Sequence, residues 1–163
     1  MRYLLDSNTF IEAKNRYYTF DICPGFWQWL IDFGQTRSGL SVVSVKKELQ
    51  QGNDELADWI TGLPNDYFTE ADLPVQRKFK QIVTYVMNHS RFSATEKGKF
   101  LAKADPWLVA TAMSEHATVI TQEKEVGTNS KKIKIPNICN HFEVPYLNIF
   151  ELLRQENVKL VLE

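Results

Sequence analysis

The sequence predicts an α/β domain with a central, mostly parallel sheet, and three observations support this fold class. Short apolar runs suited to strands alternate along the chain with longer segments of helical periodicity. The first apolar run ends on a carboxylate, Asp6, as strands do at the site-bearing edge of open α/β sheets. The chain has 163 residues and 44% apolar content, which suits one ordinary core better than two. We therefore expect residues 1–163 to form a single domain.

The N-terminal half is predicted to alternate strands with helices that stop at glycine or proline. An aromatic-rich connection at 16–24 ends at a Pro-Gly pair, and an apolar stripe that begins at Leu56 directs one helix toward the core. The segment 75–87 is the clearest amphipathic helix, with apolar residues on one side and basic residues on the other. The expected elements are a strand at 2–5, a helix at 9–14, a helix at 26–33, a strand at 40–43, helices at 45–51 and 54–61, an extended piece at 67–68 and a helix at 75–87.

The C-terminal half continues the alternation. The segment 107–113 is apolar almost all round, so we expect this helix to pack against the sheet. Pro136 is suited to the start of a helix. The expected elements are helices at 96–101 and 107–113, a strand at 118–120, an edge strand at 132–135, a helix at 136–142, a strand at 145–147, a helix at 149–155 and a last strand at 158–162.

Four acidic residues occupy positions that a parallel sheet can gather at one edge. Asp6 follows the first strand, and Glu48 lies in the helix after the second. Asp105 precedes a proline, which is the N-cap signature of a helix start, and Glu123 closely follows a later strand. Taken alone, Asp6 is explained as a helix cap. From spacing alone, the alternative also stands that the four are unrelated acids among the twenty in the chain.

Clustered carboxylates repel one another, so a protein has little reason to bring four together unless a cation neutralises them. Oxygen-rich sites with open positions suit Mg²⁺ or Mn²⁺, which keep several waters and bind substrate phosphates. The chemistry that such a site indicates is metal-assisted hydrolysis of a phosphodiester bond.

The residues around these acids resemble, in order, the four acidic motifs of PIN-domain ribonucleases. The likeness spans nearly the whole chain, and the segments 10–18, 20–27, 135–139 and 147–153 further resemble the PIN-like subfamily catalogued as domain of unknown function 4411. The four motifs are Leu4-Leu5-Asp6-Ser7-Asn8, Val45-Lys46-Lys47-Glu48-Leu49, Asp105-Pro106-Trp107-Leu108-Val109-Ala110 and Val119-Ile120-Thr121-Gln122-Glu123.

The resemblance implies a three-layer α/β/α PIN-like domain, a nuclease centre that depends on Mg²⁺ or Mn²⁺, and often the role of toxin in a bacterial toxin–antitoxin pair. By motif, Asp6, Glu48 and Asp105 would be catalytic, metal-binding acids, and Glu123 would take the fourth acidic place. The family more often has Asp there, and the nearby Glu125 competes with Glu123 for the assignment.

Three further residues are candidates for contact with the substrate. Asn8 and Thr121 match the polar positions beside the first and fourth acids of the family motifs. Contacts with RNA need basic side chains for phosphates and aromatic rings for unpaired bases. Arg16, followed by Tyr17 and Tyr18, is our preferred basic candidate.

Composition limits the other functions. Nineteen basic and twenty acidic side chains give a net charge of −1, so no bulk attraction to nucleic acid is visible. The lysines at 131, 132 and 134 are interpreted as a solvated face. No apolar run approaches the ~20 residues that cross a membrane, and no signal peptide is present, so we expect a cytoplasmic protein. Two cysteines without a CxxC pair and three scattered histidines argue against zinc.

The leading hypothesis is a metal-dependent endoribonuclease, the toxin of a type II toxin–antitoxin system, with RNA as substrate, a cognate antitoxin protein as partner and a homodimer as its assembly. The second hypothesis is a catalytically degenerate PIN-like module that binds RNA or protein without cutting. A phosphatase of the haloacid dehalogenase type also starts with an Asp at a strand end. That class is disfavoured, because it carries DxD where this chain has Asn8.

Overall fold

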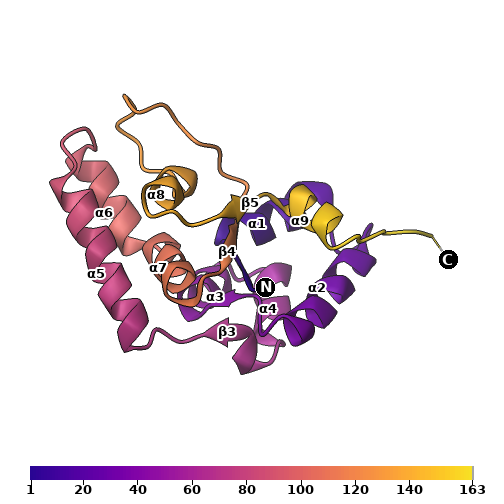
Figure 1. Cartoon of the computed structure of the whole chain (residues 1–163). Coiled ribbons are helices and arrows are strands. Elements are labelled where there is room, and N and C mark those ends of the chain that lie inside the picture. Colours follow the sequence, from indigo (N-terminus) through magenta and orange to yellow (C-terminus); the bar gives the residue numbers. More distant parts are fainter. Residues whose placement is uncertain (163) are drawn as a thin grey trace.

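Five short strands run through the middle of the molecule, as seen in the computed structural model, which describes residues 1–162 (Figure 1). The paired strands are parallel, and they form the ladders β1-β4-β5 and β2-β3. The backbone N–H of Leu5 donates to the carbonyl of Leu40 at 2.9 Å, so β2 lies beside β1 and the strand order is β3-β2-β1-β4-β5. The strands are β1 (Tyr3–Leu5), β2 (Ser41–Val42), β3 (Phe68–Thr69), β4 (Thr118–Ile120) and β5 (Tyr146–Leu147).

Helices flank these strands on both sides. α5, α6 and α7 lie on one side, and α2 and α9 lie on the other (Figure 1). This arrangement confirms the predicted α/β fold with a central, parallel sheet. The helices are α1 (Ser7–Glu12), the π-helical turn η1 (Ala13–Tyr17), α2 (Pro24–Thr36), α3 (Val43–Gln50), α4 (Glu55–Thr61), the 3₁₀ turn η2 (Asn65–Tyr67), α5 (Leu73–Asn88), α6 (Ala94–Ala102), α7 (Asp105–Glu115), α8 (Ile135–His141) and α9 (Ile149–Gln155).

Side-chain caps fix where several helices begin. Asp54 accepts a hydrogen bond from the third residue of α4 at 2.9 Å, and Asp72 does the same for α5 at 3.0 Å. Asn148 and Glu151 form a reciprocal capping box at the start of α9. These local signals are present in the sequence, which is why the predicted helices and the observed ones largely coincide.

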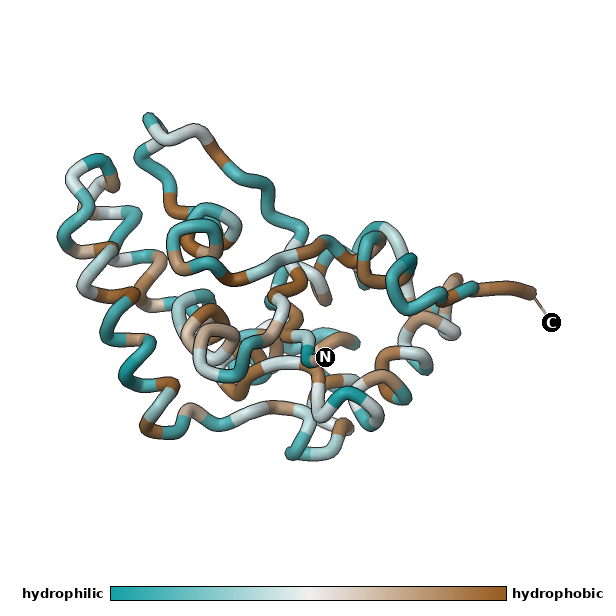
Figure 2. The backbone as a smooth tube through the Cα atoms, viewed as in Figure 1, coloured by the Kyte–Doolittle hydropathy of each residue, from teal (hydrophilic) through white to brown (hydrophobic). Residues whose placement is uncertain are grey.

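The packing of α5 on α7 forms one side of the core. Apolar and polar residues alternate along α5 with helical periodicity (Figure 2). Ile82 and Val86 are fully buried, and Leu108 of α7 is buried as well. Phe79 stacks on Trp107 with ring centroids 3.7 Å apart. α7 is held firmly by these contacts, and its first residue is one of the four acids.

Two predicted strands are wrong. Residues 132–134 are irregular and residue 135 begins α8, so no edge strand forms at 132–135. Residues 158–162 also lack strand structure, and the side chains of Val161 and Leu162 are exposed on an extended tail (Figures 1 and 2). Both segments have strand-like composition, but neither finds a neighbouring strand to pair with. None of the helices within residues 1–162 combines the length and the apolar character that a membrane span needs.

We expect Ile82→Ala to lower the free energy of unfolding by about 2–5 kcal/mol, because it leaves a cavity between α5 and α7. The exposed neighbour Gln81→Ala is the control, and we expect it to change stability by less than about 0.5 kcal/mol. Chemical denaturation measures both. Equal effects of the two substitutions would show that this helix pair does not form the core.

Candidate functional site

The register between β1 and β4 places Asp6 beside Thr121. Leu5 pairs with Ile120 at the carboxyl ends of these parallel strands, and each chain continues one residue further into a polar side chain. The Thr121 hydroxyl donates to Asp6 Oδ2 at 2.5 Å. β1 is a switch point of the sheet, because the next strand along the chain, β2, lies on one side of β1 and the later strand β4 lies on the other side. Open α/β sheets form their ligand sites at such switch points.

Asp6 is held rigidly. It caps α1, and its Oδ1 atom accepts hydrogen bonds from the Thr9 N–H at 2.6 Å and the Thr9 hydroxyl at 2.9 Å. Its side chain is only 2% exposed. Burial raises the pKa of Asp6 to about 6, although the hydrogen bonds from Thr121 and Thr9 act in the opposite direction. The expected capping role is therefore present, but capping does not account for the burial of a carboxylate with a raised pKa.

Glu48 connects the first acid to the third. It projects from α3, which begins directly after β2. Its Oε1 atom accepts a hydrogen bond from the Ser7 hydroxyl at 2.8 Å, and its Oε2 atom accepts one from the Ala104 N–H at 2.6 Å. Ser7 follows Asp6, and Ala104 precedes Asp105. Glu48 thus holds the start of α1 and the start of α7 against each other.

Glu123 approaches from the loop after β4. Its N–H donates to the Thr121 hydroxyl at 3.1 Å, and its Oε2 atom accepts a hydrogen bond from the Ile135 N–H at 2.7 Å. The charge of Glu123 raises the pKa values of both Asp6 and Asp105. Glu125 is exposed and exerts no such effect. The geometry therefore favours Glu123 over Glu125 as the fourth acid.

Asp105 lies at the electrostatic centre of the group. Burial is the largest cause that raises its pKa to about 7, and the charges of Glu123, Asp6 and Glu48 follow in that order. Lys103 acts in the opposite direction. Asp105 is the first residue of α7 and makes no capping hydrogen bond, since Ala104 occupies the cap position. The prediction that Asp105 caps this helix is wrong, and its carboxylate is left available.

None of the four acids forms an ion pair with a basic side chain in the described part of the chain. The ion pairs within residues 1–162 involve other carboxylates. Hydroxyl and backbone donors satisfy part of the hydrogen-bonding capacity of the four acids, and Lys103 offsets part of the charge on Asp105. This chemistry suits a divalent cation, because an all-oxygen donor set is the one that Mg²⁺ and Mn²⁺ prefer.

The four acids do not form a closed cage. In the described part of the chain, no three acidic, histidine or cysteine side chains lie close enough together to hold one ion. Mg²⁺ usually binds through one or two carboxylates and keeps several waters, so the residues still fit this ion. Asp6 and Asp105 could hold it directly, and Glu48 and Glu123 could be reached through water.

The predicted substrate residues lie in different settings. Asn8 is exposed next to Asp6, where it can meet a ligand. Thr121 is 2% exposed, and its hydroxyl donates a hydrogen bond to Asp6 and accepts one from the Glu123 N–H. Arg16 is on η1, where its guanidinium pairs with Glu12 at 3.2 Å and its side chain is largely exposed. The structure therefore gives Thr121 an orienting position and leaves Arg16 without a contact to the four acids within residues 1–162.

A basic cavity lies beside the acids, and it was not predicted from the sequence. It has a volume of about 220 Å³ and is lined by both Asp105 and Glu123. Lysines from α6, from the turn after it and from the loop before α8 surround it, namely Lys99, Lys103, Lys132 and Lys134. Lys99 and Lys103 are one helical turn apart just before Asp105, and that spacing was the available signal. Lys132 and Lys134, interpreted above as a solvated face, line this cavity beside Asp105 and Glu123.

The fold and the site define an open α/β protein with an acidic centre at the carboxyl edge of its sheet. The chain belongs to the family described as "Domain of unknown function (DUF4411)", whose model matches residues 3–160. Its fold is similar to that of a chain in the crystal structure of VapBC2 from Rickettsia felis bound to a DNA fragment from their promoter. The TM-score is 0.56, with 17% identity over 91% of this chain and 98% of that chain. A search of curated proteins gives no match.

We expect the stability of the metal-free protein to fall as the pH rises from about 4 to about 8. The pKa values of Asp6 (about 6) and Asp105 (about 7) lie above 3.8, so the folded state binds more protons than the unfolded chain in this window. The free energy of unfolding then decreases with pH, by about 1.4 kcal/mol for each unit of raised pKa. Urea denaturation in EDTA at several pH values measures the effect.

Asp105→Asn supplies the control for this pH dependence. The substitution removes one charge from the group, so the decrease in stability should be smaller than in the parent chain. A parent protein whose stability is constant or rises between pH 5 and 8 in EDTA would contradict the proposed crowding of charge.

Proposed function

We propose that this chain is a metal-dependent endoribonuclease that hydrolyses RNA phosphodiester bonds with Mg²⁺ or Mn²⁺, and that it acts as the toxin of a type II toxin–antitoxin pair. The observation that carries the proposal is the position of Asp105. Burial, followed by the charges of three other acids from distant segments, raises its pKa, and the same carboxylate lines a cavity surrounded by lysines. Acids for a cation and lysines for phosphates, side by side, suit a phosphodiester substrate.

The residues have distinct roles in this proposal. Asp6 and Asp105 hold the ion, with Glu48 and Glu123 completing its surroundings. The bound ion would activate a water for attack and stabilise charge on the leaving oxygen. Thr121 orients Asp6 through its hydroxyl, and Glu48 keeps α7 in register with α1 through the Ala104 N–H.

The basic cavity handles the substrate. Its lysines lie within reach of phosphates that flank the scissile bond, and Asn8 is exposed beside the first acid. Arg16 becomes a secondary candidate, because Glu12 already engages its guanidinium. The basic contacts therefore come from α6 and the loop before α8 rather than from η1.

The toxin role and the partners rest on family resemblance and on the likeness of fold to a VapBC2 chain. A cognate antitoxin protein is the expected partner, a homodimer the expected assembly, and the cytoplasm the expected location. Co-expression with the neighbouring open reading frame, followed by growth measurements with and without it, tests the pairing. Growth arrest that the neighbour relieves would support the role.

A catalytically degenerate PIN-like binding module remains the second candidate, and one observation favours it. Within residues 1–162 no three potential ligands are already close enough to share an ion. Absence of Mn²⁺ binding at millimolar concentration, combined with intact binding of RNA or of a protein partner, would select this candidate over the nuclease.

We expect Asp6→Asn and Asp105→Asn each to lower Mg²⁺-dependent RNA cleavage by about 100-fold or more, because each removes a charged ligand of the ion. Both variants should fold, since Asn is nearly isosteric and the pKa of each acid is raised in the native state. Gel assays with a labelled RNA and thermal melts check the two expectations.

Glu125→Gln is the matched control for these substitutions. It removes one carboxylate from the same loop as Glu123, but the side chain is exposed and away from the group, so cleavage should stay near the parent rate. Full activity of both Asn variants, or an equal loss in Glu125→Gln, would dispose of the assignment.

The double variant Lys99→Gln/Lys132→Gln tests the basic cavity. Loss of two phosphate contacts should raise KM several-fold with a smaller change in kcat. It should also reduce the slope of log(kcat/KM) against log salt by about 0.7 for each lysine. Lys78→Gln on α5 lies outside this cavity and should leave both values unchanged. An unaltered salt dependence in the double variant would remove these lysines from substrate binding.

A further inference from the structure

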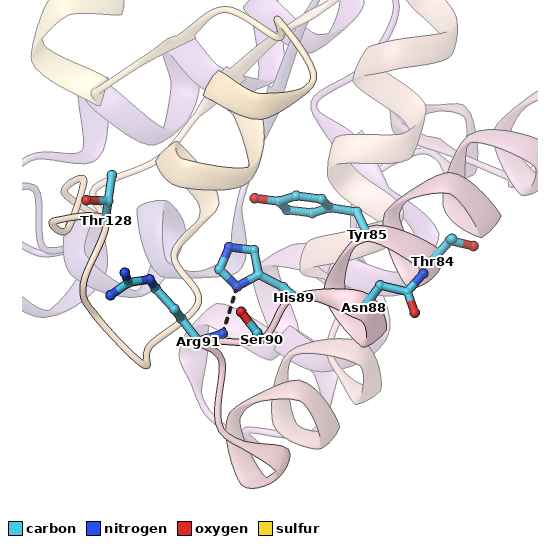
Figure 3. A pocket seen from close by; sticks show the side chains of 7 residues that line it. All are labelled: Thr84, Tyr85, Asn88, His89, Ser90, Arg91 and Thr128. Atoms are coloured by element: carbon cyan, nitrogen blue, oxygen red, sulfur yellow. Dashed lines mark hydrogen bonds between the residues drawn. The ribbon is translucent and has the colours of Figure 1, made fainter.

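A second hollow lies along α5, where the end of α8 and the turn after α5 meet this helix. Two cavities of about 590 and 490 Å³ adjoin here and share Thr84 and Tyr85 in their linings. None of the four acids lines either cavity. Figure 3 shows the smaller one, with Tyr85 and His89 near its centre and with Arg91 and Thr128, which belongs to the long loop, together on one side. We call the two cavities together the α5 groove.

The α5 groove is positively charged, although the whole chain is close to neutral. Arg77 and Lys80 line one end, Arg91 lines the other, and no acidic residue lines it anywhere. The net charge of the whole chain is −1, so this concentration of positive charge is local. The Arg91 guanidinium donates to Asn129 at 2.7 Å, which ties this end of the groove to the loop before α8. The charge suits a polyanion.

Aromatic and imidazole rings fill the space between these cations. Tyr85 stacks on His141 with centroids 3.7 Å apart and planes 17° from parallel. His89 stacks on Phe92 at 3.8 Å, and its ring also meets the edge of Tyr85. His141 is exposed, and its ring also meets Phe142 with centroids 4.7 Å apart and planes nearly perpendicular. The rings hold one another in place and can receive a base without first being ordered.

We propose that the α5 groove binds single-stranded RNA outside the catalytic site. Grooves that combine backbone-tracking cations with rings for base stacking are the usual form of single-strand binding surfaces. A duplex keeps its bases stacked internally and cannot offer them to Tyr85 and His141. The groove itself specifies a single-stranded nucleic acid, and the choice of RNA rests on the proposed function.

The position of the groove connects it with the acidic centre. The loop between β4 and α8 lines the groove through Thr128 and lines the basic cavity through Lys132. The turn after α5 contributes Arg91 to the groove and leads into α6, whose Lys99 lines the basic cavity. A strand cut at the acidic centre could therefore continue into the groove, which would extend recognition beyond the scissile bond.

Fluorescence anisotropy tests the proposal with a labelled oligouridylate of about 12 nucleotides, a length within the range of single-strand sites. The full chain carrying Asp105→Asn, in EDTA, serves as the parent so that no cleavage occurs. Adding His141→Ala should weaken binding about five-fold or more, which corresponds to about 1 kcal/mol of stacking. His141→Phe keeps a ring and should retain most of the affinity.

The charged residues have their own matched control. Arg77→Gln/Lys80→Gln should weaken binding several-fold and reduce its salt dependence. Lys78→Gln removes the same type of charge from the same helix at a position that does not line the groove, and it should bind as the parent does. Circular dichroism and melting temperatures confirm that each variant is folded.

Three results would overturn the proposal. Binding that is unchanged in His141→Ala and in Arg77→Gln/Lys80→Gln removes RNA from the groove. Duplex RNA that competes as well as the single strand contradicts base stacking. Unchanged RNA binding together with weaker binding of a co-purified partner chain would assign the groove to a protein. Because cleavage plays no part in this assay, RNA binding in the groove without nuclease activity would retract the proposed function and leave the groove assignment standing.

Discussion

The parallel pairing of β1 with β4 is the constraint on which the site depends. It brings the ends of two strands that are more than a hundred residues apart into register, so Asp6 and Thr121 emerge side by side. Glu48 then fixes the start of α7 through a hydrogen bond from the Ala104 N–H. With α7 held there and packed on α5, Asp105 has little freedom to move away from the other acids. The fold thus fixes the positions of the carboxylates, although their like charges repel one another.

The electrostatic consequence is a native state that holds its own negative charges too close together. In ordinary ion pairs a lysine or arginine would relieve the repulsion, yet the ion pairs of the described chain are made elsewhere. Burial, and after it the charge of the neighbouring acids, raises the pKa values of Asp6 and Asp105, so protons neutralise these groups at low pH. At neutral pH a divalent cation is the natural substitute, and the lysines of the neighbouring cavity remain available for a polyanionic substrate. Such strain at a site, compensated by packing elsewhere, is typical of function.

Local signals explain which features could be predicted from the sequence. Helix α9 is recognisable from its capping residue Asn148 and its periodicity, and β4 from a buried apolar run. The four acids could be named because each lies near a strand end or in a helix that leads away from one, and because the residues around them resemble the four PIN-domain motifs. The strands expected at 132–135 and 158–162 are absent because strand composition does not supply a pairing partner. The spacing of Lys99 and Lys103 is a local signal for part of the basic cavity, but the full cavity and the α5 groove are each assembled from several elements whose packing angles no local pattern specifies.

The proximity of the acids to a common cation is tested most directly by anomalous diffraction from crystals grown with Mn²⁺. We predict a strong anomalous peak within coordination distance of the Asp6 and Asp105 carboxylates, and its loss in crystals of the Asp105→Asn variant. A map without a peak at this position, from crystals in which the four carboxylates keep the arrangement described above, would contradict the assignment of a metal centre to this edge of the sheet.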